Sequence, residues 1–292
     1  MFLSIRTGRF FTVRNLVNIL EANSFRLLLA VGMTFIIAAG GIDLSVGSML
    51  SLSAIITALL LKGNTPVWAA VLSGLLFGTL LGITNGLLVH YTGINSFIIT
   101  LGTSFLYRGL ALIITLGIPI SKLPAAYRTF GCGDVFQMES GVYMALLVLL
   151  ISFPLLYRMR WGHYITTLGG NPLALRRCGV RTGFWRVSTF AVMGFLAALA
   201  GIIISARLNS AEPNAGLNME MDAITAVIMG GTPLHGGSAA LAVGAELMRT
   251  HGVDSLIGRT AAVMLGSTET TFYTISVYFG AATQVGAVRE RD

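Results

Sequence analysis

Charge is scarce in this sequence. Asp, Glu, Lys and Arg make up only 11% of its 292 residues, roughly half of what a soluble globular protein carries. Apolar residues make up 54%, and several apolar runs approach the ~20 residues that are needed to cross ~30 Å of hydrocarbon. This composition excludes an ordinary soluble domain and predicts an integral membrane protein.

Cysteine is scarce as well, and no catalytic or metal-binding pattern is present. The two cysteines, Cys132 and Cys178, lie in loops that the expected topology places on opposite sides of the membrane, so they cannot pair. No run has metal-ligand spacing, and no nucleophile accompanies His251 and Asp254. The N-terminus lacks the long apolar core of a signal peptide. We therefore expect no enzyme activity, no cofactor and no metal.

The arginines indicate membrane topology rather than binding to nucleic acid. The net charge is +7. However, the arginines lie in loops beside apolar runs, and no basic-aromatic face of a soluble domain accompanies them. We therefore expect no nucleic-acid partner.

One polar island, residues 158–186, separates two long apolar runs. It carries six arginines and no carboxylate. Arginine-rich loops this short stay on the cytoplasmic side, because moving such charge across a membrane is costly. Within the island, residues 168–172 predict a turn, and residues 173–178 predict a short helix that ends at Gly179. This pattern favours a docking surface in the cytosol, with an ordinary cytosolic loop as the alternative.

The apolar runs predict an all-α, polytopic bundle of transmembrane helices. Residues 1–26 are amphipathic and favour a helix at the membrane interface, whereas residues 27–39 are apolar but too short to span. A glycine pair, a carboxylate and serines then predict a broken or re-entrant helix near residues 40–48. Residues 118–140 suit an external loop. Further spans are expected at residues 67–89, 96–117, 141–157 and 187–206, with another apolar element at 223–231.

Asp43 and Arg108 are charges within apolar stretches. A charge at membrane depth is costly and often marks a transport pathway. The alternative for Asp43 is a structural role as the N-cap of a helix that starts near Leu44, assisted by Ser45 and Ser48. Arg108 is a candidate partner of Asp43, or it extends to the membrane interface. These alternatives stay open from the residues alone.

Small and polar residues also recur on the spans. Four glycines occur at every fourth position from residue 74 to residue 86, so they predict a helix face that another backbone approaches closely. Hydroxyl and amide side chains on the spans either line a passage or bond to neighbouring helices, and the second role is the commoner one. The side chains in question are Thr34, Thr79, Asn85, Thr100 and Ser104.

A set of short motifs runs through residues 1–237 in a fixed order. The motifs are Asn15-Leu16-Val17-Asn18-Ile19-Leu20, Ala30-Val31-Gly32-Met33-Thr34, Gly40-Gly41-Ile42-Asp43-Leu44-Ser45-Val46-Gly47-Ser48, Thr100-Leu101-Gly102-Thr103, Gly169-Gly170-Asn171-Pro172, Asp222-Ala223-Ile224 and Gly230-Gly231-Thr232. In order and spacing, this set resembles the permease subunits of bacterial ABC importers for ribose, xylose, galactose and related sugars.

The resemblance implies a multi-pass permease of the bacterial inner membrane, in contact with membrane lipid and without a cofactor. Its expected partners are a second permease copy, a cytosolic ABC ATPase subunit and an external sugar-binding protein. The island is then the ATPase-coupling loop, formed by Gly169, Gly170, Asn171, Pro172, Leu173, Leu175, Arg176 and Gly179. Candidates for the broken helix and the pathway are Gly40, Gly41, Asp43, Ser45, Gly47, Ser48 and Arg108.

Beyond Gly237 the sequence departs from that family. Its motifs there are Arg249-Thr250-His251-Gly252, Asp254-Ser255, Ile257-Gly258-Arg259, Gly266-Ser267-Thr268, Thr270-Thr271-Phe272-Tyr273 and Tyr278-Phe279-Gly280. They resemble the C-terminal part of spore maturation protein B, in the nucleoside-recognition/gate group.

We therefore expect two segments and a chimera. Residues 1–237 form a permease domain that lacks the family's first and last helices, and residues 238–292 form the spore-maturation-protein-B-like segment. The alternatives to a sugar permease are a membrane protein of the spore-maturation or gate type and a non-functional fusion of two truncated membrane proteins.

Overall fold

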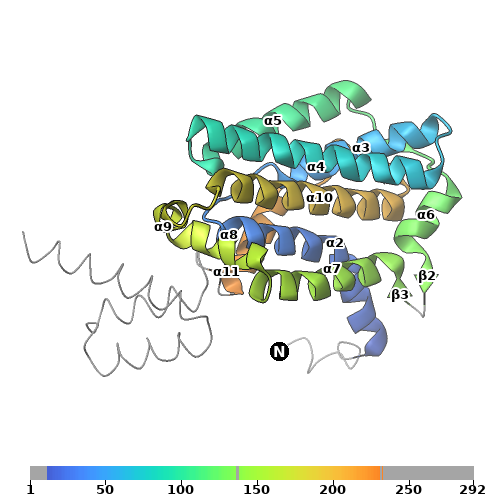
Figure 1. Ribbon diagram of the computed structural model, residues 1–292. Coiled ribbons are helices and arrows are strands. Elements are labelled where there is room, and N and C mark those ends of the chain that lie inside the picture. Colours follow the sequence, from blue (N-terminus) through green and yellow to red (C-terminus); the bar gives the residue numbers. More distant parts are fainter. Residues whose placement is uncertain (1–11, 136–137, 231, 233–292) are drawn as a thin grey trace, which may run out of the picture.

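The structure is a computed structural model that describes residues 12–135, 138–230 and 232 (Figure 1). The predicted fold class is confirmed, because the described residues form an all-α bundle with only short two-residue strands. Five helices in this described part of the chain are long and apolar enough to cross a membrane. They comprise residues Val17–Ala38 of α2 (Val13–Ala38), α4 (Val67–Thr92), α5 (Ser96–Thr115), α7 (Ser140–Tyr157) and α10 (Thr182–Leu208).

The first described helix corrects one prediction. We expected an interfacial helix over residues 1–26 and a separate short apolar run, but α2 continues through both from Val13 to Ala38. Residues 1–11 lie outside the described range. Arg26 does not interrupt the helix, because arginine is a good helix former, and its side chain lies 3.6 Å from Asp222. The aliphatic neighbours of Arg26 then supply the apolar length of a span.

The expected break lies directly after α2. The chain leaves helical geometry at Ala39 and re-enters it at Val46, where the 17-residue helix α3 (Val46–Lys62) begins. Gly47 and Ser48 therefore belong to the first turn of α3 rather than to the break. The break proper is residues 39–45.

Helix α10 lies at the centre of the bundle and packs against α4, α2 and α3 (Figure 1). The glycine stripe on α4 explains the closest of these contacts. A side chain at Gly82 would collide with the carbonyl of Phe190 on α10, and one at Gly194 would collide with the carbonyl of Gly78. The predicted close approach of two backbones is thus confirmed.

The segment expected as an external loop contains structure that the sequence did not indicate. Strand β1 (Ile120–Ser121) pairs antiparallel with β4 (Ser210–Ala211), and β2 (Asp134–Val135) pairs with β3 (Met138–Glu139). Between them lies the short helix α6 (Ala125–Cys132), whose Tyr127 is buried against α10. The Tyr127 hydroxyl lies 2.6 Å from Ser205 Oγ. These contacts tie the segment to one end of α10.

The island at the other end of α10 is mostly helical. Helix α8 spans Arg160–Gly170, and the six-residue helix α9 spans Pro172–Arg177. The predicted turn over residues 168–172 is therefore wrong for residues 168–170, which form the last turn of α8. The last described helix, α11 (Met219–Met229), packs against α2.

Candidate functional site

Asp43, the carboxylate in the break, is completely buried. Its Oδ1 accepts hydrogen bonds from the backbone N–H of Ser45 at 2.8 Å and from the Ser45 hydroxyl at 2.6 Å. The N-cap of α3 is Ser45 rather than Asp43, so the predicted cap was misplaced by two residues. Asp43 nevertheless organises the chain that leads into the helix. Within the described part of the chain, its Oδ2 has no hydrogen-bond partner.

A buried network continues from the break to α4 and α5. The Asn85 amide donates to Ser45 Oγ at 2.7 Å, and the Tyr107 hydroxyl donates to Asn85 Oδ1 at 3.0 Å. Asn85 is fully buried. This side chain, which we considered for a passage, therefore bonds to neighbouring helices in the structure.

The first turns of α5 hold the backbone of the break. Ser96 Oγ accepts the N–H of Ile42 at 2.9 Å, and Thr100 Oγ1 accepts the N–H of Leu44 at 3.0 Å. Because buried backbone N–H groups require partners, these hydroxyls compensate for the helical bonds that the break lacks. Thr100 is also a side chain that we considered for a passage, and it is buried here.

Gly40 connects the break to the island. Its φ is +76°, and a β-carbon at this position would lie 3.1 Å from the α-carbon of Gly169 near the end of α8. Both the backbone angle and the close approach require glycine. Gly41, the next residue, is half-buried against Ser96. Two motifs that lie far apart in the sequence therefore form one contact.

The other end of the break meets a loop that sequence reasoning missed. The Arg108 guanidinium donates to the carbonyls of Pro213 and Ala215 at 2.5 and 2.8 Å, so it does not pair with Asp43 as considered. The Ser51 hydroxyl also donates a hydrogen bond to the Pro213 carbonyl, at 2.8 Å. A side chain at Gly47 would collide with the carbonyl of Gly216. The Glu212–Gly216 stretch has glycine, proline and asparagine, which offered a turn signal but no indication of its partners.

Ser48 has a local role. Its hydroxyl donates to the carbonyl of Ser45 at 2.7 Å, in the first turn of α3. Ser45 and Ser48 are both buried. Of the pathway candidates, only Gly40 is exposed, while Gly41 and Arg108 are half-buried.

The short helix of the island has well-defined ends. Asn171 is its N-cap and accepts the N–H of Ala174 at 3.0 Å, and Pro172 occupies the first turn, where a missing N–H has no cost. Gly179 follows the helix with a φ of +76°, as the predicted stop requires. The predicted short helix is confirmed, with bounds at Pro172 and Arg177.

The side chains of α9 differ in what they offer to a partner. Leu173 is 65% exposed, whereas Leu175 is only 4% exposed and belongs to the core of its own chain. The expectation that Leu175 fills a groove on a partner is therefore wrong. The Nε of Arg176 donates to Thr182 Oγ1 at 3.1 Å, while its side chain stays exposed. Gly170 is exposed, and a β-carbon there would meet no atom of the described residues within 4 Å.

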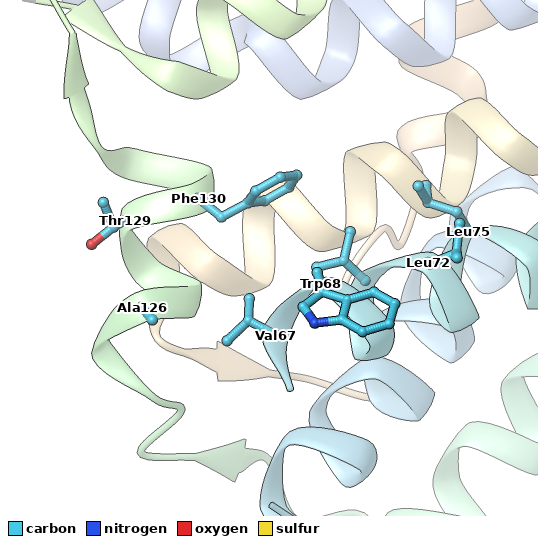
Figure 2. Close-up of a pocket in the computed structure, with 8 residues that line it drawn as sticks. Val67, Trp68, Leu72, Leu75, Ala126, Thr129 and Phe130 are labelled. Carbon is cyan, nitrogen blue, oxygen red and sulfur yellow. The ribbon is translucent and has the colours of Figure 1, made fainter. Parts of the chain in front are cut away.

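An apolar hollow of about 710 Å³ lies between α4 and α6 (Figure 2). Figure 2 shows Trp68 and Leu72 of α4 on one side and Phe130 of α6 on the other. Trp68 is 74% exposed. Because its lining is mostly apolar and one wall belongs to a candidate membrane span, this hollow suits an apolar occupant such as lipid better than a polar ligand.

A profile for a transporter family matches residues 15–285. The family is described as "Branched-chain amino acid transport system / permease component". The match crosses Gly237, where we expected the permease to end. The part of the chain beyond residue 232 lies outside the described range, so the structure does not test the predicted boundary.

Several curated proteins are similar over most of the chain. The ribose import permease protein of Haemophilus influenzae is 41% identical over 232 residues, which is 78% of this chain and 72% of that protein. The D-allose transport system permease protein of Escherichia coli is 38% identical over 242 residues, or 82% of this chain and 74% of that protein. An autoinducer 2 import system permease protein of Yersinia pseudotuberculosis is 34% identical over 245 residues, which is 84% of this chain and 70% of that protein. No solved structure matches the chain.

Proposed function

The chain belongs to this family of transporter permease components, and from that premise we propose that it is the membrane-spanning subunit of an ATP-driven importer for a monosaccharide of the ribose or allose type. Permease components are transporters and not enzymes, and the chain is a multi-pass protein of the bacterial inner membrane. The observation that carries the sugar proposal is the 41% identity to a ribose import permease over 78% of the chain.

The island is the proposed docking surface for a cytosolic ABC ATPase subunit. The exposed Leu173 would enter an apolar hollow of the ATPase, and the exposed Arg176 and Arg177 would meet acidic groups. Gly170 leaves room beside them, because no described residue comes within 4 Å of a β-carbon at this position. The short, capped helix holds these groups in one orientation.

Motion at the docking surface would reach α5 through the break. Gly169 of α8 contacts Gly40, and the break that follows Gly40 is bonded to Ser96 and Thr100 of α5. Because packed backbones without side chains transmit displacement directly, a shift of α8 would move the first turns of α5. Asp43 and Ser45 would keep the break rigid during this motion.

The proposed partners also include a second permease copy and an external sugar-binding protein. One face of α5 buries small and polar side chains, including Ser96, Thr100 and Thr103, while the opposite face exposes Phe105 and Ile113, each by 71%. An apolar face of this size suits membrane lipid or a second copy of the chain. Selectivity for the sugar would rest with the external binding protein.

Complementation tests the sugar proposal. The chain is expressed in a strain that lacks its ribose permease but retains the ribose ATPase and binding protein, and uptake of labelled ribose is measured. The proposal predicts ATP-dependent ribose uptake. A matched strain for allose distinguishes the two sugars. If the chain inserts stably into the membrane but supports uptake of neither sugar, the proposal is wrong.

The boundary at Gly237 and the resemblance of residues 238–292 to spore maturation protein B stay predictions. The profile match through residue 285 favours a permease origin for most of this segment over a foreign one. Sequencing of the genomic locus across Gly237 tests the boundary. An uninterrupted permease frame would contradict a natural chimera, whereas an unchanged sequence with the spore-maturation motifs would support it.

A further inference from the structure

A second, more polar cleft opens near the island. Its volume is about 300 Å³, and its lining includes Gly40 from the break, Asn95 and Ser96 from the start of α5, and Arg186 from α10. Thus three segments that are distant in the sequence converge on one cleft. The α9 groups that are proposed to meet the ATPase, Leu173, Arg176 and Arg177, do not line this cleft.

The polar groups of this cleft include hydrogen-bond donors for which the described residues supply no acceptor. Within the described part of the chain, no hydrogen bond or ion pair is recorded for the Arg186 guanidinium or for the Asn95 side-chain N–H₂. The Ser96 hydroxyl accepts the N–H of Ile42, and among the described residues its own proton has no recorded acceptor. Three donors that share one cleft match the oxygens of an anion.

The charge around the cleft is also positive, because arginines are present there without nearby carboxylates among the described residues. Arg176 of α9 is close enough to repel Arg186 electrostatically. No Asp or Glu occurs in residues 44–133 or 140–211, which include all of α4, α5, α8, α9 and α10. Asp43 is the nearest carboxylate in the sequence to Gly40, but it is buried and bonded to Ser45. A counter-charge for Arg186 must therefore come from outside these segments.

We propose that this cleft binds the phosphate of an anionic phospholipid headgroup, with Arg186, Asn95 and Ser96 as its donors. Arg186 is the fifth residue of the α10 span, which places it at headgroup depth. Ile94 and Phe97, beside the cleft, are 46% and 43% exposed and offer an apolar surface for the acyl chains. Basic pockets between transmembrane helices are known to bind such headgroups. This combination favours a lipid over a soluble anion or a protein carboxylate.

Native mass spectrometry of the full-length chain tests the proposal. The protein is purified in detergent with equal amounts of phosphatidylglycerol and phosphatidylcholine, and the retained lipids are counted. We expect preferential retention of phosphatidylglycerol, and a loss of about tenfold in its apparent affinity in Arg186→Gln. The matched control is Arg158→Gln, which removes an exposed arginine of the same island that does not line the cleft. Arg186→Lys keeps the charge and should retain part of the preference, and thermal unfolding confirms that each variant is folded.

Each alternative gives a distinct result. Equal losses in Arg186→Gln and Arg158→Gln would mean diffuse attraction to the membrane surface and would overturn the proposal. Displacement of phosphatidylglycerol by millimolar inorganic phosphate, with no dependence on acyl chains, would assign the cleft to a soluble anion and would also overturn it. If Arg186→Gln leaves lipid retention unchanged but weakens copurification of the ATPase, the cleft binds a protein carboxylate instead. Ribose uptake is not part of the readout, so the proposal can fail or hold independently of the sugar assignment.

Discussion

Gly40 and Gly169 lie in backbone contact, and a β-carbon built on Gly40 would be 3.1 Å from the α-carbon of Gly169. This contact joins the interruption between α2 and α3 to the end of α8, beside the proposed docking helix. It also gives a physical reason for the glycine at position 40.

We predict that Gly40→Ala impairs transport more than it impairs insertion. A side chain at a left-handed φ costs about 1–2 kcal/mol, and the new methyl group would push against Gly169. Uptake per inserted molecule, measured in membrane vesicles, should therefore fall. Gly117→Ala is the control, because Gly117 has a similar φ of +75° but its β-carbon would meet no described atom within 4 Å. Equal uptake by the two variants would show that the Gly40 contact transmits nothing.

The docking surface predicts a selective effect at Leu173. Leu173→Asp should reduce copurification of the ATPase at least tenfold. In the complex, a carboxylate would take the place of an apolar side chain in a contact without water, and this replacement should weaken binding by about 2 kcal/mol or more. Leu116→Asp serves as the control, since Leu116 is 83% exposed at the opposite end of a span and its left-handed φ tolerates Asp. Undiminished copurification by Leu173→Asp would place the ATPase contact elsewhere.

The buried network predicts a stability effect at Asn85. Asn85→Leu removes the buried amide that bonds to both Ser45 and Tyr107, so it should lower the free energy of unfolding by about 1–3 kcal/mol. Thr79→Val in the same helix removes only a hydrogen bond to the helix backbone and should cost less. Thermal unfolding in detergent compares the two variants. Equal thermal unfolding midpoints for Asn85→Leu and Thr79→Val would mean that the network adds nothing to stability.

Arg108 should control the exposure of the loop that follows β4. Arg108→Met removes the donors to the carbonyls of Pro213 and Ala215, so the loop should open more often. A cysteine placed at the exposed Asn214, in a variant without native cysteines, should then react faster with a maleimide. Arg128→Met, at an exposed position of α6, is the matched control. A rate unchanged by Arg108→Met would mean that other contacts hold the loop.

Cys132 should react with maleimide in a pH range higher than usual. Burial, reinforced by the nearby Glu139 carboxylate, raises the pKa of the Cys132 thiol. Less thiolate is present near pH 8 than in an unfolded chain, so labelling should be slow there and should rise at higher pH. The measurement uses Cys178→Ser and compares native protein with protein unfolded in detergent. Identical pH profiles would contradict the burial of Cys132.

The sequence predicted the features that depend on local composition. The apolar runs located α4, α5, α7 and α10, and the position of Gly179 located the end of α9. The glycines of α4 indicated a close helix contact, although their partner Gly194 was not identified. In each case a short-range rule was sufficient, because lipid demands apolar length and tight packing demands small residues.

The sequence did not predict which distant segments meet. Arg108 was considered as a partner of Asp43, yet it bonds to carbonyls of a loop about a hundred residues later, and backbone carbonyls carry no sequence signal. Leu175 was indistinguishable from Leu173 by residue type, but one is buried and the other exposed. Arg26 seemed to separate an interfacial helix from a span, yet α2 continues through it from Val13 to Ala38.

The orientation of the docking helix is the central claim, and Cys178 reports it directly. In Cys132→Ser, the exposed Cys178 is the only cysteine, so a membrane-impermeant maleimide can be applied to intact spheroplasts and to inverted vesicles. The account predicts labelling in inverted vesicles and none in spheroplasts. Labelling of intact spheroplasts would place the island outside the cell, where no cytosolic ATPase could reach it.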